Sequence, residues 1–236
     1  MKSIIFDSGP IISLTMNNLL WTLEPLKKHF NGEFYIPAAV KSEIIDRPLG
    51  IKRFEFEAMQ VRAEIDCKVI QIIEEEKTHQ KSMDLLDLAN HSFYVKGTNI
   101  NIVSIGEMSV LAAALMLSSQ AVAMDERTTR DLIERPERIA RHLQENLGKK
   151  VTIENSNIKQ LRGMIKEIKV IRSVELAAVA FEIGLLDGYI DRCRNPSLEL
   201  KKKLLDSVLW GVKLQGCAVS ENEINQIIEY LMPRVE

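Results

Sequence analysis

The chain has 236 residues, of which 46% are hydrophobic and 27% charged, and its formal net charge is -2. These proportions exclude a disordered or collagen-like chain and predict a globular protein of one or two domains. The longest apolar run, residues 110–117, is far shorter than the roughly 20 residues that span a bilayer, and only a short apolar stretch precedes Asp7. We therefore expect a cytoplasmic protein with no signal peptide and no membrane partner.

Apolar runs alternate with amphipathic segments up to Asp125. They predict strands at 3–6, 33–36, 69–73 and 121–124, and helices at 21–30, 38–45, 51–66, from 74 to about 90, and 108–117. The segment Asp7–Pro10 is typical of a turn. Because strands that alternate with helices form crossover connections, we predict an α/β fold with a parallel sheet flanked by helices.

The remainder of the chain is predicted to be mainly helical. Helices fit residues 128–147, 173–186, 197–214 and 220–231, with short strands at 151–153 and 168–171. We place a boundary near 155, in the polar run Asn155-Ser156-Asn157. The predicted organisation is a first domain at 1–155 and a mainly helical C-terminal domain or extension at 156–236.

Four acidic residues stand at positions from which they can reach one cleft. Asp7 and Asp125 each follow a predicted strand, and ligands of parallel sheets bind where strands end. Glu43 lies in the helix after the second strand, and Glu107 lies in the first turn of the helix before the fourth strand. Converging carboxylates repel one another unless cations share the site, and Mg²⁺ or Mn²⁺ prefers such oxygen ligands.

Each acid also has a structural interpretation that needs no ligand. Glu43 can pair with Arg47 four residues on, and Glu107 can complete a capping box with Ser104. Asp7 can cap the turn that follows it, and Asp125 can cap the helix that begins near residue 128. The case for a site therefore depends on the four acids together.

The order and setting of these acids resemble the PIN-domain family of metal-dependent nucleases. The matching segments are Ile4–Ile12, Ile36–Ile44, Gly106–Ala114 and Val122–Asp125. Segments 171–176 and 213–217 look like the C-terminal extension of longer archaeal PIN proteins. The sequence departs from the family pattern in two places: Glu107 stands where Asp is commoner, and Met124 where a small polar residue is usual.

The resemblance implies a PIN-like fold and a catalytic metal site. It implies that Mg²⁺ or Mn²⁺ is held by four residues, with the Ser8 hydroxyl in support: Asp7, Glu43, Glu107 and Asp125. The implied activity is that of a metal-dependent endoribonuclease that hydrolyses phosphodiester bonds. The alternative is a catalytically weak PIN-like module that binds RNA or a protein partner. The expected partner is RNA, or single-stranded DNA. A protein regulator and a homodimer are both compatible with the resemblance.

Basic residues supply candidate phosphate contacts. Arg127 and Arg130 closely follow Asp125 and can hold a phosphate, or they can pair with Asp131 and Glu134. Two basic clusters further along the chain can contact nucleic acid or form solvated faces. The first contains Lys159, Arg162, Lys166, Lys169 and Arg172, and the second contains Arg192, Arg194 and Lys201–Lys203.

Overall fold

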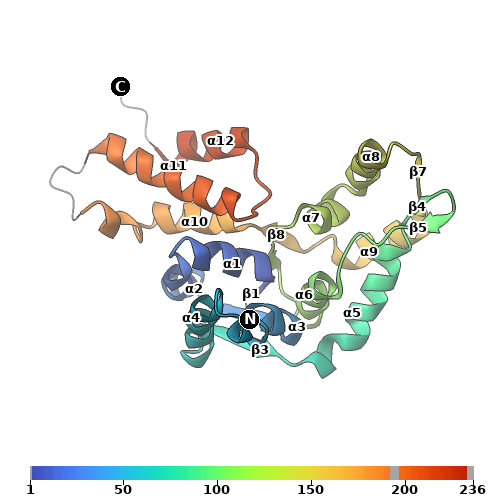
Figure 1. The fold of residues 1–236 in the computed structure, drawn as a ribbon, viewed down its shortest axis with the longest axis horizontal. Coiled ribbons are helices and arrows are strands. Elements are labelled where there is room, and N and C mark those ends of the chain that lie inside the picture. The colour runs from blue at the N-terminus through green and yellow to red at the C-terminus, as the bar shows by residue number, and fades with distance from the viewer. Residues whose placement is uncertain (1, 192–196, 233–236) are drawn as a thin grey trace.

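A five-stranded parallel sheet forms the centre of the molecule (Figure 1). The structure is a computed structural model and describes residues 2–191 and 197–232. The strands lie in the order β3-β2-β1-β6-β8, and every neighbouring pair is parallel. Their bounds are β1 Ser3–Phe6, β2 Glu33–Pro37, β3 Ile70–Ile73, β6 Ala121–Ala123 and β8 Lys169–Ile171. The predicted α/β class with a parallel sheet is confirmed.

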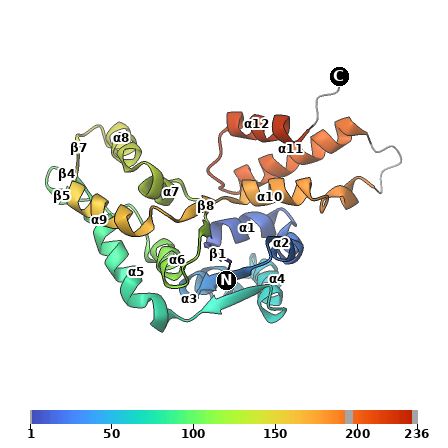
Figure 2. The same cartoon turned by 180° about the vertical axis from the view of Figure 1, so that it is seen from behind.

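Helices flank this sheet, as the alternating pattern predicted. They are α1 Ser8–Met16, α2 Leu23–Phe30, α3 Ala38–Lys41, α4 Glu55–Asp66, α5 Glu75–Asn90 and α6 Ile105–Met116. Two short 3₁₀ turns, η1 Leu20–Thr22 and η3 Pro48–Gly50, lie among them, and the π-helical turn η2 Ser42–Asp46 continues α3. Helix α6 packs against β1, β2 and β6, while α1 packs against α4 (Figure 2).

The turn predicted at Asp7–Pro10 is wrong, because Ser8 begins α1. Asp7 stands at the N-cap position with extended backbone angles, and Pro10 falls in the first turn. A proline is tolerated there because the first amides of a helix have no intrahelical acceptor. One consequence is that the chain passes from β1 into α1 with Asp7 at the junction.

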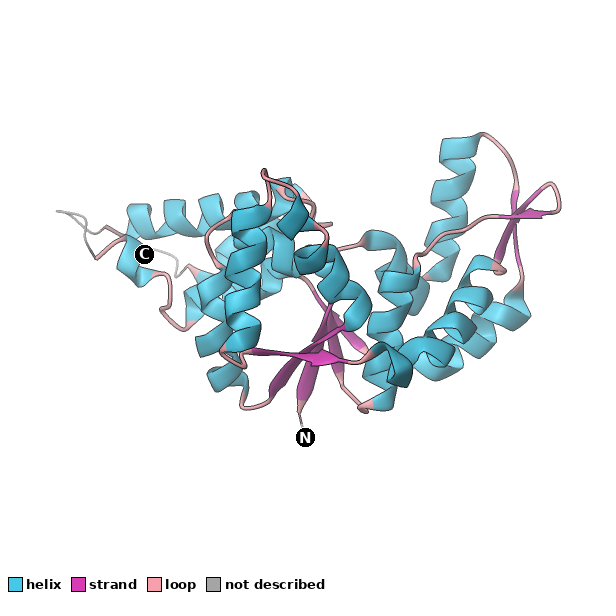
Figure 3. Cartoon of the chain, turned by 60° about the horizontal axis from the view of Figure 1, so that its bottom comes forward, coloured by secondary structure: helices cyan, strands magenta, loops and turns pink. Residues whose placement is uncertain are grey.

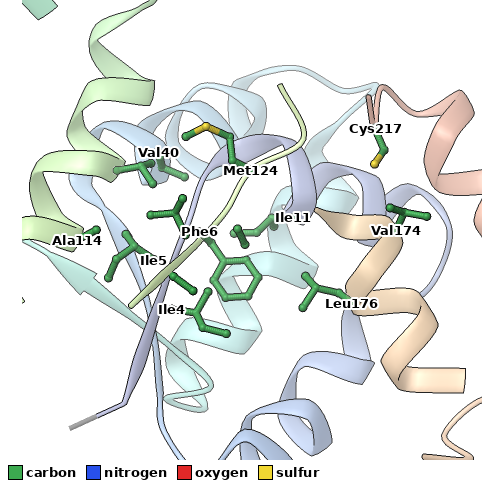
Figure 4. Close-up of a cluster of buried hydrophobic side chains, with 14 of the residues drawn as sticks. Ile4, Ile5, Phe6, Ile11, Val40, Ala114, Met124, Val174, Leu176 and Cys217 are labelled. Carbon is green, nitrogen blue, oxygen red and sulfur yellow. The ribbon is translucent and has the colours of Figure 1, made fainter. Parts of the chain in front are cut away.

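The core is built on the central strand β1. Ile5 and Phe6 have no exposed surface, and Ile4 is almost as buried, which fits a strand covered on both faces. Figure 4 shows these side chains with Val40 and Ala114 on one side and with Leu176 near Phe6. The core therefore includes residues from the C-terminal part of the chain.

A second, smaller sheet belongs to a side lobe (Figure 3). It is antiparallel, with the order β5-β4-β7. Its strands are β4 Phe93–Val95, β5 Thr98–Asn99 and β7 Val151–Ile153, and helices α7 Arg127–Glu134, α8 Pro136–Leu147 and α9 Asn155–Ile165 accompany it. The sequence did not predict β4, β5 or α9. Asn155, where the boundary was predicted, is the first residue of α9.

Three long helices at the C-terminus form a further arm. They are α10 Ser173–Glu182, α11 Leu198–Leu214 and α12 Glu221–Leu231, with a 3₁₀ turn η4 at Asp187–Tyr189. Helices α10 and α11 pack on α1, whereas α7 and α8 rise on the other side of β8 (Figure 1). In the part of the chain that is described, no helix has both the length and the apolar character needed to cross a membrane.

Candidate active site

Three strands end level with one another at the same edge of the main sheet. The register aligns Ala123 of β6 with Phe6 of β1 on one side and with Ile171 of β8 on the other. The amide of Asp7 donates to the Ala123 carbonyl oxygen at 2.9 Å, which extends this pairing beyond β1. Strands β2 and β3 lie on one side of β1, and β6 and β8 lie on the other. Ligands of open parallel sheets bind at such a switch in strand order.

Glu43 and Glu107 reach this edge from two helical segments. Glu43 lies in the π-helical turn η2, a geometry that is rare and frequent at functional sites. Glu107 lies in the first turn of α6. The two segments meet at Gly106, where an added Cβ atom would lie 3.1 Å from Glu43 Oε1. Gly106 therefore permits a close approach of α6 to the Glu43 carboxylate.

All four predicted acids line one cavity of about 350 Å³. A fifth carboxylate, that of Glu126, also lines it, and the remaining lining residues are Ser8, Gly9, Ser13, Ser104, Gln215 and Gly216. Among the described residues around this cavity, none is Lys, Arg or His. Its walls therefore carry concentrated negative charge with no positive side chain to balance it.

The pKa of Asp7 reflects both its burial and this concentration of negative charge. Its side chain is buried, with a relative exposure of 6%. Burial, followed by the charges of Glu107 and Glu43, raises the pKa of Asp7 from 3.8 to about 7, although the backbone amides of Ser8 and Gly9 act in the opposite direction. Near neutral pH, the carboxyl group of Asp7 is therefore poised between its neutral and charged forms.

Glu107 has the structural role that its spacing predicted, and it faces the cavity as well. Its Oε2 atom accepts hydrogen bonds from the Ser104 amide at 2.6 Å and the Ser104 hydroxyl at 2.7 Å, which completes the capping box. Its Oε1 atom accepts from the Thr129 hydroxyl at 2.9 Å, across to α7. Capping and a role in the cavity are therefore compatible at this residue.

Asp125 is held by three hydrogen bonds and does not cap α7. Its Oδ1 atom accepts from the Ser173 amide at 2.7 Å, and its Oδ2 atom accepts from the hydroxyls of Ser13 at 2.9 Å and Ser173 at 2.8 Å. Glu126 is the N-cap of α7 instead, and it accepts from the Thr129 amide. A carboxylate offers about four lone-pair positions, so Asp125 retains capacity toward the cavity.

The C-terminal arm supports Asp125 directly. The Ala218 amide donates to the backbone oxygen of Asp125 at 3.1 Å, and Arg172 donates to the Ala218 carbonyl at 2.8 Å. Cys217 lies beside Asp125 near Val174 (Figure 4), and burial, followed by the Asp125 charge, raises the pKa of its thiol to about 12. Gln215 and Gly216 form part of the cavity wall. The loop at 215–218 is therefore built into this site.

Arg172 fits neither of the two alternatives considered for the first basic cluster, a nucleic-acid contact or a solvated face. Its guanidinium is buried and pairs with Glu175 and with Glu223, which lies 2.9 Å away at the start of α12. These partners raise its pKa despite the opposing effect of burial. Arg172 therefore fastens α10 to α12 rather than facing solvent. Of the second basic cluster, Arg192 and Arg194 lie outside the described residues.

The other predicted residues lie near the cavity without all lining it. Ser8 lines it, and its role as a supporting hydroxyl stays a prediction. Arg127 lines a neighbouring cavity, and its Nε atom lies 3.8 Å from Asp131 Oδ2, the pairing considered as the alternative. Arg130 is not among the residues that line either cavity, and its Nε atom is buried without a hydrogen-bond partner.

The donor set suits a hard divalent cation, because five carboxylates and several hydroxyls supply only oxygen. The raised pKa of Asp7 points the same way, since a cation would relieve the repulsion that contributes to it. As the side chains stand, no three acidic, histidine or cysteine groups within the described residues are arranged to hold one ion. The role of the acids as metal ligands stays a prediction.

Sequence reasoning missed Glu126, Ser13, Ser173 and the loop at 215–218. Glu126 could have been found, because it directly follows Asp125 at the end of a predicted strand. Ser13 could not, since residues 8–16 were not predicted to be helical. Ser173 depends on the pairing of β8 with β6, and the loop depends on the packing of α11 and α12.

The comparisons with known proteins agree with this geometry. A family model described as a PIN domain matches residues 3–137, more than half of the chain, and a search of curated proteins finds no match. The fold and the site define a nuclease-type α/β protein. The chain belongs to the PIN-domain family, whose members are generally nucleases. Ser173 and the loop at 215–218 lie beyond the matched segment.

Proposed function

We propose that this protein is a divalent-metal-dependent ribonuclease. The observation that supports the proposal is the cavity at the switch in strand order, where five carboxylates converge with no positive side chain among its described lining residues. Asp7, Glu43, Glu107 and Asp125 are the proposed ligands of Mg²⁺ or Mn²⁺. Glu126 faces the same cavity and can contribute to the negative field.

Each acid has a separate part in this proposal. A divalent ion bound there supplies a nucleophilic water of lowered pKa and neutralises charge on the phosphate. Asp125, fixed by Ser13 and Ser173, is the rigid member of the set. Glu107 is held by its capping box, while Asp7 is charged or neutral according to what balances it. The chain itself needs no nucleophile, because water attacks the phosphorus.

The test is the dependence of RNA cleavage on metal, together with the chemistry of the product ends. We expect the purified protein to cleave single-stranded RNA with Mg²⁺ or Mn²⁺, to stop when EDTA is added, and to leave 5'-phosphate ends, measured by end-labelling and mass spectrometry. Products that end in 2',3'-cyclic phosphate would contradict the proposal, because they require the 2'-hydroxyl of the RNA as the nucleophile. RNA binding without cleavage under all metal conditions would favour a catalytically weak module.

A further inference from the structure

A second cavity, of about 490 Å³, lies between α7 and α8. Arg127, Thr128 and Asp131 face it from α7, and a stripe of α8 residues faces it from the other side. That stripe consists of Arg138, Ile139, Arg141, His142, Leu143 and Glu145, and Asn101 and Ile102 complete the wall. Arg138, Arg141, His142 and Glu145 have the i, i+3, i+4, i+7 spacing of one face of α8, and Ile139 and Leu143 lie on the adjoining face.

Three arginines face this cavity against two acids, Asp131 and Glu145, so its lining carries a small net positive charge. Arg138 and Arg141 are exposed, and within residues 2–191 and 197–232 neither has an acidic partner at ion-pair distance. Asp131 is buried and lies 3.8 Å from Arg127 Nε, so it orients that arginine. Arginine is well suited to phosphate because its planar group can donate two parallel hydrogen bonds.

The floor of the cavity is apolar. Ile139 is buried, and Ile102 and Leu143 are partly buried against the hydrophobic core. A volume of this size lies within the range of small-molecule sites, which combine an apolar lining with a few polar groups. Arginines above an apolar floor match one nucleotide, with its base on the floor and its phosphate on the guanidinium groups.

Residues that are close in the sequence line the two cavities. Glu126 lines the acidic cavity, and Arg127, the next residue, lines the cavity between α7 and α8. Likewise, Ser104 lines the acidic cavity, and Ile102 lines the cavity between α7 and α8. A phosphodiester that approaches five carboxylates is repelled, and positive charge beside them offsets part of that repulsion. An RNA strand that crosses the start of α7 can therefore extend from the acidic cavity to the arginines of the cavity between α7 and α8.

We propose that the cavity between α7 and α8 binds a nucleotide of single-stranded RNA next to the phosphate at the acidic cavity. This inference rests on the proposed function and adds where the substrate strand is held. Arg138 and Arg141 contact the backbone phosphate, Arg127 assists from α7, and the base packs on Ile102, Ile139 and Leu143. A base that is paired in a duplex cannot enter the cavity, so single-stranded RNA is preferred.

The test compares R138Q/R141Q with wild type in RNA binding. A fluorescein-labelled 12-nucleotide oligouridylate is titrated in EDTA at several NaCl concentrations, and fluorescence anisotropy gives Kd. Since each neutralised phosphate of a single strand contributes about 0.7 to the slope of log K against log [salt], and both arginines contact the same phosphate, we expect the slope to fall by about 0.7 and Kd to rise about tenfold. An unchanged slope and Kd would overturn the proposal.

A matched control removes two arginines elsewhere. Arg53 precedes α4 and Arg62 lies on it, at the far side of the main sheet from α8 (Figure 1). R53Q/R62Q should bind RNA as wild type does, and an equal loss of affinity in both double variants would contradict the proposal, because net charge alone would then explain the loss.

A second control replaces the single strand with a 12-base-pair duplex. The Kd for the duplex should depend little on Arg138 and Arg141, and an equal dependence would overturn the assignment to a single strand.

Hydrolysis of a small substrate separates this proposal from the proposed function. Bis(p-nitrophenyl) phosphate has no neighbouring nucleotide, so R138Q/R141Q should cleave it with Mn²⁺ at the wild-type rate. For the oligonucleotide, the KM of R138Q/R141Q should be about tenfold higher than that of wild type. A loss of activity on the small substrate would place the arginines in the chemistry and contradict their role as a binding site. If wild type cleaves neither substrate, the proposed function fails, and the anisotropy data still decide on the nucleotide site.

Discussion

Replacing Asp7 with Asn should stabilise the metal-free protein and abolish its nuclease activity. The pKa of Asp7 is raised from 3.8 to about 7 in the folded chain. Between these values the unfolded chain has lost the proton and the folded chain retains it, so the stability of wild type falls as pH rises. A pKa difference of about three corresponds to about 4 kcal/mol, and we expect Asp7→Asn to add about 2–4 kcal/mol at pH 8.

The measurement is urea unfolding in EDTA at several pH values from about 4 to 8. The stability gain of Asp7→Asn should be close to zero at the acid end, because pH 4 lies near the pKa of 3.8 in the unfolded chain, where the two states bind almost the same number of protons. Asp66→Asn is the matched control, since the Asp66 side chain is 70% exposed at the end of α4. RNA cleavage with Mn²⁺ should fall about a hundredfold or more in Asp7→Asn. Equal stability of wild type and Asp7→Asn at every pH would contradict this account.

Replacing Asp125 with Ala should have the opposite effect on stability. The substitution leaves the buried Ser173 amide without its acceptor and removes the hydrogen bonds from the hydroxyls of Ser13 and Ser173. Loss of a buried charged acceptor with several donors costs about 3 kcal/mol. We therefore expect the free energy of unfolding to fall by about that amount, although Asp125 lines the same cavity as Asp7.

Asp125→Asn is the control that separates hydrogen bonding from charge. An Asn side chain can still accept from the Ser173 amide and can donate to the two hydroxyls, so its stability in urea should stay within about 1 kcal/mol of wild type. Nuclease activity should nevertheless fall, because one carboxylate is lost from the cation site. If Asp125→Ala were as stabilising as Asp7→Asn, Asp125 would belong to the repelling group, and its hydrogen bonds would not hold its charge.

The strands of the main sheet could be predicted because each is a short apolar run that ends at polar residues. Ile5 and Phe6 are buried on a central strand, and such strands are apolar on both faces. The hairpin of β4 and β5 was harder to find, because its strands have only three and two residues. Lys96 and Gly97 both have positive φ, which suits the tight turn between these strands, but Lys-Gly is a weak turn pattern.

The four acids could be assigned to one cavity because the rules for parallel sheets place strand ends together. Asp7 and Asp125 follow adjacent strands, and the capping box at Ser104 fixes Glu107 at a helix start. The groups that hold Asp125 could not be assigned in this way. Ser173 lies 48 positions further along the chain, and only the pairing of β8 with β6 brings it within hydrogen-bond distance.

The most direct test of the acidic cavity as a cation site is the effect of Mn²⁺ on the melting temperature of wild type and Glu107→Gln. Gln can still accept from the Ser104 amide and donate to Thr129, so the helix start is kept while one charge is removed. A ligand at a hundred times its Kd stabilises the folded state by about 2.7 kcal/mol, which corresponds to roughly 5–10 °C for a chain of this size. We predict such a rise for wild type and less than half of it for Glu107→Gln. No rise in wild type, or the same rise in both proteins, would contradict a metal site formed by these carboxylates.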